Sequence, residues 1–191
     1  MNLLFIGDVV GQSGCDFLES RMYKLKREYD IDVTVVNGEN SAQGNGITPQ
    51  SYRQLLNMGA DVVTTGNHSF RRREAEELYD TNEQLLRPAN YPEGVMGHGV
   101  TYIDMCPYKI AVVNLMGTMY MEAVENPFNY VDKLLESIDT PNIIVDFHAE
   151  ATSEKKAMGF YLQKRCTAVL GTHTHVQTAD ETILGGHTAY I

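Results

Sequence analysis

The stretch VTVVNGEN, residues 33–40, joins a short apolar run to polar side chains around a glycine. The β-branched residues Val33 to Val36 are typical of a buried strand. Asn37, Glu39 and Asn40 follow that run at once. In open α/β sheets the carboxyl ends of the strands form the crevice where ligands bind. The stretch therefore predicts a buried strand that ends in a polar site.

The same pattern recurs along the chain and predicts an α/β fold. Short runs rich in Val and Ile predict buried strands, at residues 3–6, 33–36, 62–65, 110–115, 143–147 and 168–170. Amphipathic stretches between them predict helices, over residues 14–29, 48–58, 71–79, 128–138 and 153–164. Strands spaced by helices indicate the α/β class, and 191 residues fit one domain, 1–191.

Two segments depart from this alternation and predict β-hairpins. Residues 100–116 contain two strand-like runs joined by Cys106-Pro107-Tyr108-Lys109. Residues 182–191 repeat that shape around Gly185-Gly186. Short runs joined by turn residues are typical of antiparallel pairs.

Five predicted strands end in side chains that bind metals, often just after a glycine. These side chains are Asp8, Glu39, Asn40, Asn67, His68, Asp146, His148, His173 and His175. Oxygen and imidazole ligands without a thiolate suit Zn, Mn or Fe better than Ca or a structural zinc. In extended chain His173 and His175 would share a face with Cα atoms about 6.8 Å apart. Because two metals about 3.5–4 Å apart could each take one histidine, and Glu39 could bridge them, the residues favour a dinuclear site.

Each of these elements also has an interpretation without metal. Asp8 alone would serve equally well as a helix cap, and Gly66-Asn67-His68 as a turn. His148 alone is more typical of a hydrogen-bonded core histidine. The spacing of His173-Thr174-His175 favours metal by itself. Because capping does not account for ligand chemistry at five independent strand ends, metal binding is the better interpretation.

Other polar residues are not predicted to belong to the site. His98 and His187 lie in glycine-rich segments without supporting partners. The run Arg71-Arg72-Arg73 is predicted to form a solvated first helical turn. Its closeness to His68 leaves the alternative that one arginine contacts a substrate phosphate.

Charge and cysteine content exclude several classes of protein. Fifteen Lys and Arg against 25 Asp and Glu give a formal net charge of −10, which argues against a broad grip on nucleic-acid backbone. Two bound divalent ions would bring that charge to about −6. Cys15, Cys106 and Cys166 form no CxxC motif, so a zinc ribbon or disulfide framework is not expected. Without a signal peptide or an apolar run of about 18 residues, we expect a cytoplasmic protein that does not enter a membrane.

The series of strand-end motifs resembles that of the calcineurin-like metallophosphoesterases. The motifs are Gly7-Asp8, Gly38-Glu39-Asn40, Gly66-Asn67-His68, His148 and Gly171-Thr172-His173-Thr174-His175. The blocks Asn37–Ala42 and His148–Lys155 are similar to the bacterial YmdB-type branch, known for hydrolysing cyclic nucleotide phosphodiesters. The resemblance runs from Met1 to Ile191. It implies an α/β/β/α sandwich, in which two packed mixed sheets are flanked by helices.

The resemblance also implies a role for each motif residue. One metal ion would be held by Asp8, Glu39, Asn40 and His175. The second would share Glu39 and be completed by Asn67, His148 and His173. A hydroxide shared by the two ions would attack phosphorus, and His68 would protonate the leaving oxygen. Iron is the first choice of metal and manganese the second.

Two features depart from the usual pattern of the superfamily. Many members carry a histidine two residues after the first aspartate, where this chain has Val10. In the YmdB-type branch Asn40 compensates for that change. Relatives run several tens of residues beyond the match at Ile191, so we expect a truncated chain that lacks the C-terminal strands completing the second sheet. Strand edges exposed in this way would promote pairing with a second copy.

The predicted function is a dinuclear-metal phosphodiesterase for 2′,3′- or 3′,5′-cyclic nucleotides. Its partner would be a small-molecule substrate rather than an extended nucleic acid. The alternative is a metal-binding regulatory module with little or no turnover. Amidohydrolases also bind two metals through His-x-His, but there the motif normally lies on the first barrel strand, and here it lies near the end.

Overall fold

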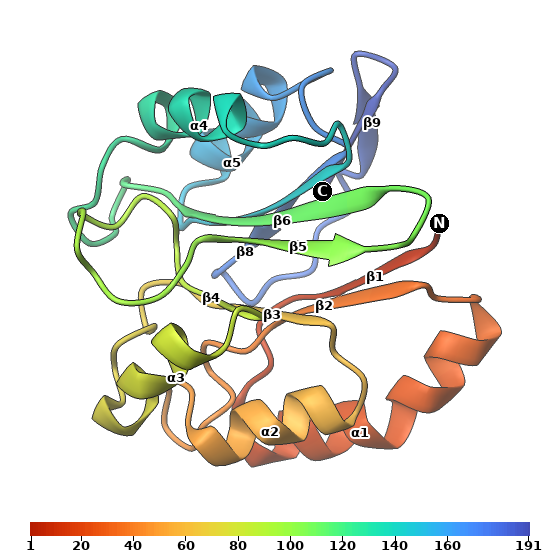
Figure 1. The fold of residues 1–191 in the computed structure, drawn as a ribbon, viewed down its shortest axis with the longest axis vertical. Helices are drawn as coiled ribbons and strands as arrows, with labels where there is room; N and C mark the ends of the chain where they lie inside the picture. The colour runs from red at the N-terminus through yellow and green to blue at the C-terminus, as the bar shows by residue number, and fades with distance from the viewer.

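Two sheets pack face to face in the computed structural model, which describes the whole chain, residues 1–191 (Figure 1). The smaller sheet has the order β1 (Leu3–Ile6), β2 (Val33–Asn37), β3 (Val62–Thr64) and β4 (Leu85–Leu86). The larger has the order β5 (Val100–Asp104), β6 (Lys109–Met116), β7 (Ile143–His148), β8 (Ala168–Thr172), β10 (Thr188–Tyr190) and β9 (Thr182–Leu184). The first sheet is wholly parallel, and the second is mixed.

Helices cover the outer face of each sheet and complete the sandwich (Figure 1). The smaller sheet is covered by α1 (Gly11–Glu28), α2 (Pro49–Asn57) and α3 (Glu76–Thr81), the last preceded by a 3₁₀ turn at Arg73–Ala75. The larger sheet is covered by α4 (Pro127–Glu136) and α5 (Thr152–Tyr161). This arrangement confirms the predicted α/β/β/α architecture. None of these helices is long and apolar enough to cross a lipid bilayer.

Three apolar layers hold the sandwich together. One lies between α1, α2 and the smaller sheet, and another between α4, α5 and the larger sheet. The third lies between the two sheets, where Val33 and Val35 of β2 meet Ile144 of β7. Val36 points the other way, into the helical layer. This alternation explains why β2 is apolar on both faces, since a parallel strand between two layers is buried on each side.

Turn chemistry sets the boundaries of the predicted elements. Thr48 caps α2 because its Oγ1 accepts a hydrogen bond from the Ser51 backbone N–H at 3.1 Å, and Pro49 follows at the first helical position.

Both predicted hairpins are confirmed. Asp104 pairs with Lys109 in one, and Thr188 pairs with Leu184 in the other.

Two secondary-structure elements differ from the sequence prediction. The segment predicted as a helix from residue 71 becomes helical only at Arg73, so Arg71 and Arg72 do not form a first turn. Strand β4 was not predicted, because a pair of leucines is too short to show a strand pattern. It is defined by parallel pairing to Val63 and Thr64 of β3.

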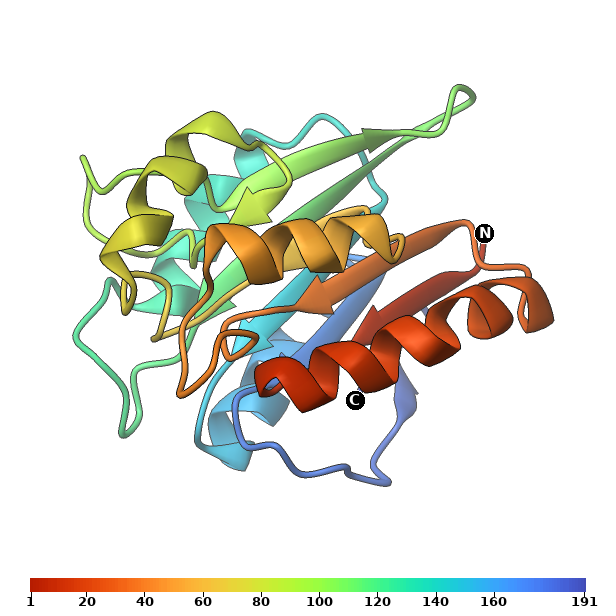
Figure 2. The ribbon, with the colours of Figure 1, turned by 90° about the horizontal axis from the view of Figure 1, so that it is seen from below.

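The parallel strands bring the predicted ligands to one end of the sandwich. Polar residues after β1, β2 and β3 come from the smaller sheet, and those at the ends of β7 and β8 from the larger (Figure 2). A hydrogen bond from the His173 backbone N–H to Asp8 Oδ2, 3.0 Å long, joins the two sheets there. The site therefore lies across both sheets.

The layer between the sheets predicts a large effect for truncation of Ile144, which is 1% exposed. Ile144→Ala should lower the free energy of unfolding by about 2–5 kcal/mol, because it removes buried methyl groups and leaves a cavity. Urea unfolding measures this loss. Ile183→Ala is the matched control, since Ile183 is 61% exposed, and should change stability by less than about 0.5 kcal/mol. Equal effects of the two changes would contradict this account of the core.

Candidate metal centre

Glu39 lies at the centre of the strand-end cluster and is fully buried. Its Oε1 lies 3.2 Å from both His148 Nε2 and His68 Nδ1, and 3.1 Å from Asn40 Nδ2. Its Oε2 accepts a 3.0 Å hydrogen bond from the His68 backbone N–H. Burial by itself would raise the pKa of Glu39, but hydrogen bonds from His148 and His68 outweigh it and hold the pKa well below its usual range. Glu39 is therefore a buried, ionised carboxylate.

Three atoms with lone pairs surround Nε2 of His148. Asn67 Oδ1 and His173 Nδ1 each lie 3.1 Å from it, and Glu39 Oε1 lies 3.2 Å away. The ligand atoms of Glu39, His148 and His173 lie within 4.8 Å of one another. One nitrogen carries at most one proton and cannot satisfy three acceptors. A cation among these atoms would satisfy them all.

The other ring nitrogen of His148 explains which lone pair is available. Its Nδ1 lies 2.9 Å from Thr172 Oγ1, whose hydroxyl donates to Asp146 Oδ1 at 2.6 Å. The threonine oxygen therefore accepts from Nδ1–H, which leaves the Nε2 lone pair available to a metal ion. Without a metal, a proton is favoured at Nε2. Burial opposes it, but the hydrogen bond and charge of Glu39 raise the pKa of His148 above its usual value.

Asp8, Asn40 and His175 form a second group beside Glu39. Oδ1 of Asp8 is buried and accepts no hydrogen bond, although His175 Nε2 lies 3.3 Å away. The same His175 nitrogen lies 3.3 Å from Asn40 Nδ2. An unsatisfied buried polar atom costs about 1–3 kcal/mol. A cation held by the Asp8 oxygen would remove that cost, so this group also fits a metal.

His173 and His175 reach their groups through a turn. Strand β8 ends at Thr172, and both histidines have left-handed backbone, with φ of 95° and 53°. The expectation that they share one face of an extended chain is therefore wrong. The turn directs His173 toward His148 and His175 toward Asp8, so that each histidine serves a different group.

Gly66 permits the close approach of the two sheets at this site. A Cβ on Gly66 would overlap the ring of His148 and would lie 2.5 Å from Glu39 Oε2. Any other residue would force the two ligands apart. This explains why a glycine precedes Asn67 and His68.

His68 lies at the edge of the cluster and lines a cavity of about 300 Å³ together with Gly44 and Asn45. Its Nδ1 lies 2.9 Å from Asn40 Oδ1 and 3.2 Å from Glu39 Oε1. These contacts occupy Nδ1, so Nε2 is the nitrogen available to a ligand in the cavity.

Arg72 has a structural contact that the sequence did not predict. Its Nε donates to the Asn45 carbonyl at 2.9 Å, and its Nη2 donates to the Gln43 carbonyl. Arg72 therefore stabilises the loop at residues 43–45, which forms one side of the cavity beside His68. His98 and His187 lie outside the cluster, the first bridged to Leu86 of β4 and the second in the β9–β10 turn.

Asp146 is among the predicted strand-end metal ligands, but its carboxylate does not face the cluster. It is fully buried and accepts hydrogen bonds from Thr64 Oγ1 at 2.5 Å, Thr172 Oγ1 at 2.6 Å and Asn37 Nδ2 at 3.1 Å. Burial raises its pKa to about 6 against the opposing effect of His148 and these donors. Its position two residues before His148 on one strand, and hence on the same face, is the signal that could have identified this supporting role.

Glu150 is a further residue that the sequence did not single out. Its Oε2 lies 3.0 Å from Nε2 of His173, and its side chain is half exposed. It occupies the ring nitrogen of His173 that faces away from His148. A metal-binding histidine commonly donates its other ring N–H to a carboxylate in this way.

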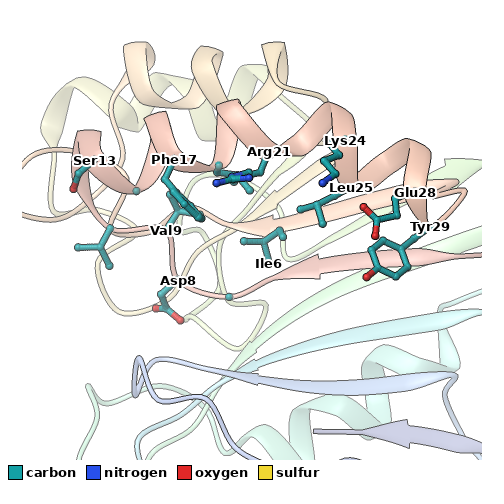
Figure 3. A pocket seen from close by; sticks show the side chains of 14 residues that line it. Ile6, Asp8, Val9, Ser13, Phe17, Arg21, Lys24, Leu25, Glu28 and Tyr29 are labelled. Atoms are coloured by element: carbon teal, nitrogen blue, oxygen red, sulfur yellow. The ribbon is translucent and has the colours of Figure 1, made fainter.

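A larger cavity, about 850 Å³, lies away from the histidines, between α1 and β1 (Figure 3). Phe17, Arg21 and Leu25 of α1 face Ile6 of β1 across it. Asp8 borders this groove, but Figure 3 shows its side chain pointing away from α1. Because the candidate metal ligands converge elsewhere, the smaller cavity beside His68 is the candidate site for chemistry.

Comparisons with known proteins agree with these motifs. The family model described as YmdB-like protein matches residues 4–191. The 2′,3′-cyclic-nucleotide 2′-phosphodiesterase of Bacillus subtilis strain 168 is 47% identical over 193 residues, which cover 100% of this chain and 73% of that protein.

Two solved structures share the fold. A protein of Thermus thermophilus has a TM-score of 0.94 at 40% identity, covering 100% of this chain and 74% of its own. A phosphatase of Mycoplasma pneumoniae also has a TM-score of 0.94, at 33% identity, covering 99% of this chain and 69% of its own. In each comparison the match spans nearly all of this chain and about seven tenths of the longer relative.

The link from Asp146 through Thr172 to His148 generates a prediction about metal affinity. Thr172→Val removes the hydroxyl that fixes Nδ1–H of His148, so Mn²⁺ should bind about 10–100-fold more weakly. Thr172→Ser keeps the hydroxyl and should retain most of the affinity. Equilibrium dialysis against graded Mn²⁺ measures both. If the valine and serine variants bind equally well, the hydroxyl has no part in orienting His148.

Proposed function

Because this chain belongs to the YmdB-like protein family, we propose that it is a metal-dependent phosphodiesterase that hydrolyses cyclic nucleotides. The first substrate class is 2′,3′-cyclic nucleotides, as the name of the Bacillus subtilis relative suggests, and 3′,5′-cyclic nucleotides are the second. The observation that carries the proposal is the convergence of imidazole, carboxylate and amide lone pairs around His148 Nε2, beside an unsatisfied Asp8 oxygen.

The two groups of side chains would each hold one metal ion. Asp8, Glu39, Asn40 and His175 form the first set, and Glu39, Asn67, His148 and His173 form the second. By the family resemblance iron is our first choice of metal and manganese the second; ligands of oxygen and imidazole suit both metals and do not rank them. When bound, two such ions would activate water for attack and neutralise charge on the phosphoryl oxygens.

His68 is the proposed proton donor. Its Nδ1 lies 2.9 Å from Asn40 Oδ1 and 3.2 Å from Glu39 Oε1, which leaves Nε2 free for a ligand in the cavity that His68 lines. A proton at Nε2 can then pass to the leaving oxygen of a substrate in that cavity. An alkoxide leaves poorly unless it is protonated, so general acid catalysis by His68 is worth about 10²–10⁴-fold in rate.

The cavity and the net charge favour a small substrate. A volume of about 300 Å³ lies within the range of small-molecule sites. A formal charge of −10 opposes binding along a nucleic-acid backbone but not the capture of one phosphate ester by metal ions.

The proposed activity predicts hydrolysis that depends on His173. With added Mn²⁺ the protein should hydrolyse bis-p-nitrophenyl phosphate and 2′,3′-cyclic AMP, and His173→Ala should abolish both activities because it removes a metal ligand. His187→Ala is the matched control and should retain full activity, since His187 lies in the β9–β10 turn outside the cluster. A folded, metal-loaded protein that turns over neither ester would instead indicate a metal-binding regulatory module.

The role of His68 predicts a difference between two leaving groups. His68→Ala should lower kcat for 2′,3′-cyclic AMP by about 10²–10⁴-fold. Hydrolysis of bis-p-nitrophenyl phosphate should fall much less, because p-nitrophenolate leaves without a proton. Metal content, measured by elemental analysis, should stay unchanged. Loss of metal in this variant would make His68 a ligand rather than the acid.

A further inference from the structure

The turn that carries His173 and His175 has few attachments to the rest of the protein. Both histidines have positive φ, which non-glycine residues adopt only where the surroundings hold them there. The backbone N–H of His173 is attached to Asp8 Oδ2 at 3.0 Å. Thr174 lies between the two histidines, and its Oγ1 accepts a hydrogen bond from Lys155 Nζ at 3.1 Å. Glu150 Oε2 lies 3.0 Å from the ring of His173, so Lys155 is the attachment of the turn at Thr174 itself, between the two histidines.

Lys155 contacts the turn instead of forming an ion pair. The charges of Asp8 and Glu150 act on its ammonium, yet no carboxylate is paired with it. The next residue, Lys156, does pair with a carboxylate, that of Asp180 at 3.3 Å. Burial lowers the pKa of Lys155 against the pull of those carboxylates. The ammonium group is therefore partly removed from water, and its one hydrogen bond to a side chain goes to the hydroxyl of the turn.

The path of the Lys155 side chain also depends on a glycine. A Cβ on Gly171, in β8, would lie 3.0 Å from Lys155 Cδ, which is closer than most real contacts. Gly171 therefore leaves room for the aliphatic part of Lys155 to cross β8. Gly171 provides the space, and Lys155 and Thr174 form the hydrogen bond.

We propose that Lys155 is a positioning residue that holds the Thr174 turn so that His173 and His175 face their two groups of ligands. The inference rests on the proposed function only in taking these histidines as metal ligands. Lys155 forms no hydrogen bond or ion pair with any of the proposed metal ligands. Its effect passes through Thr174.

Metal affinity tests the proposal because a positioning effect and a charge effect would change it in opposite directions. Lys155→Met keeps the length of the side chain and removes the ammonium. Loss of a positive charge near the site by itself strengthens cation binding, whereas loss of positioning weakens it. We expect Mn²⁺ affinity to fall about 10–100-fold, as for other residues that orient metal ligands. Equilibrium dialysis against graded Mn²⁺ measures the change.

Variants of Thr174 provide the second arm of the experiment. Thr174→Val should reproduce the loss without any change of charge, and Thr174→Ser should restore the affinity. The double variant with Lys155→Met and Thr174→Val should bind no more weakly than either single variant, because both remove one shared interaction. Lys156→Met is the matched control on the same helix, and should bind Mn²⁺ as the unchanged protein does. Binding by Lys155→Met that is as tight as in this control, or additive losses in the double variant, would overturn the proposal.

Hydrogen exchange of the metal-free protein separates this inference from the proposed function. Amide exchange at residues 173–175 should be faster in Lys155→Met and unchanged in Lys156→Met, with both proteins folded. If the unchanged protein bound no Mn²⁺, the proposed function would fail. The exchange rates would still test whether Lys155 holds the turn, because they are measured without metal. Unchanged exchange in Lys155→Met would overturn that role.

Discussion

A buried negative charge at the end of β2 is the constraint on which the site depends. Glu39 has no exposed surface, and ionising it in such a place is costly unless partners surround it. Those partners come from both sheets, His68 after β3 and His148 at the end of β7. The two sheets must therefore pack closely at this end, and Gly66 provides the necessary space. The apolar layer between the sheets holds them in that position.

Residues that are not themselves candidate ligands hold the ligand side chains in position. Asp146, buried among Thr64, Thr172 and Asn37, leaves Thr172 to accept from His148 and so determines which imidazole nitrogen faces the ligands. Lys155 acts in the same way on the turn after β8. These polar contacts lie at the end of the sandwich where the two sheets meet, so the packing of the sheets also aligns the candidate ligands.

The sequence predicted much of this arrangement because its signals are local. Residues 33–36 showed a strand buried on both faces, and the polar residues that follow showed where the strand ends meet. Features that depend on contacts between segments distant in sequence could not be predicted. Leu85 and Leu86 form a strand only because β3 lies beside them, and Arg72 leaves the helix because a loop carbonyl binds it.

The backbone of the histidine motif also lay beyond sequence reasoning. The spacing of His173 and His175 fits an extended chain as well as a turn, and only the surrounding contacts select the turn. Lys155 is adjacent in sequence to Lys156, and both lie on α5. The two lysines were indistinguishable until the structure showed that one reaches Thr174 and the other Asp180.

The central claim is that Glu39 lies between two metal ions. Crystals of the metal-loaded protein, measured at the iron and manganese absorption edges, would test it most directly. The account predicts two anomalous peaks about 3.5–4 Å apart, one beside Asp8 and His175 and the other beside His148 and His173. A single peak, or peaks away from Glu39, would contradict it.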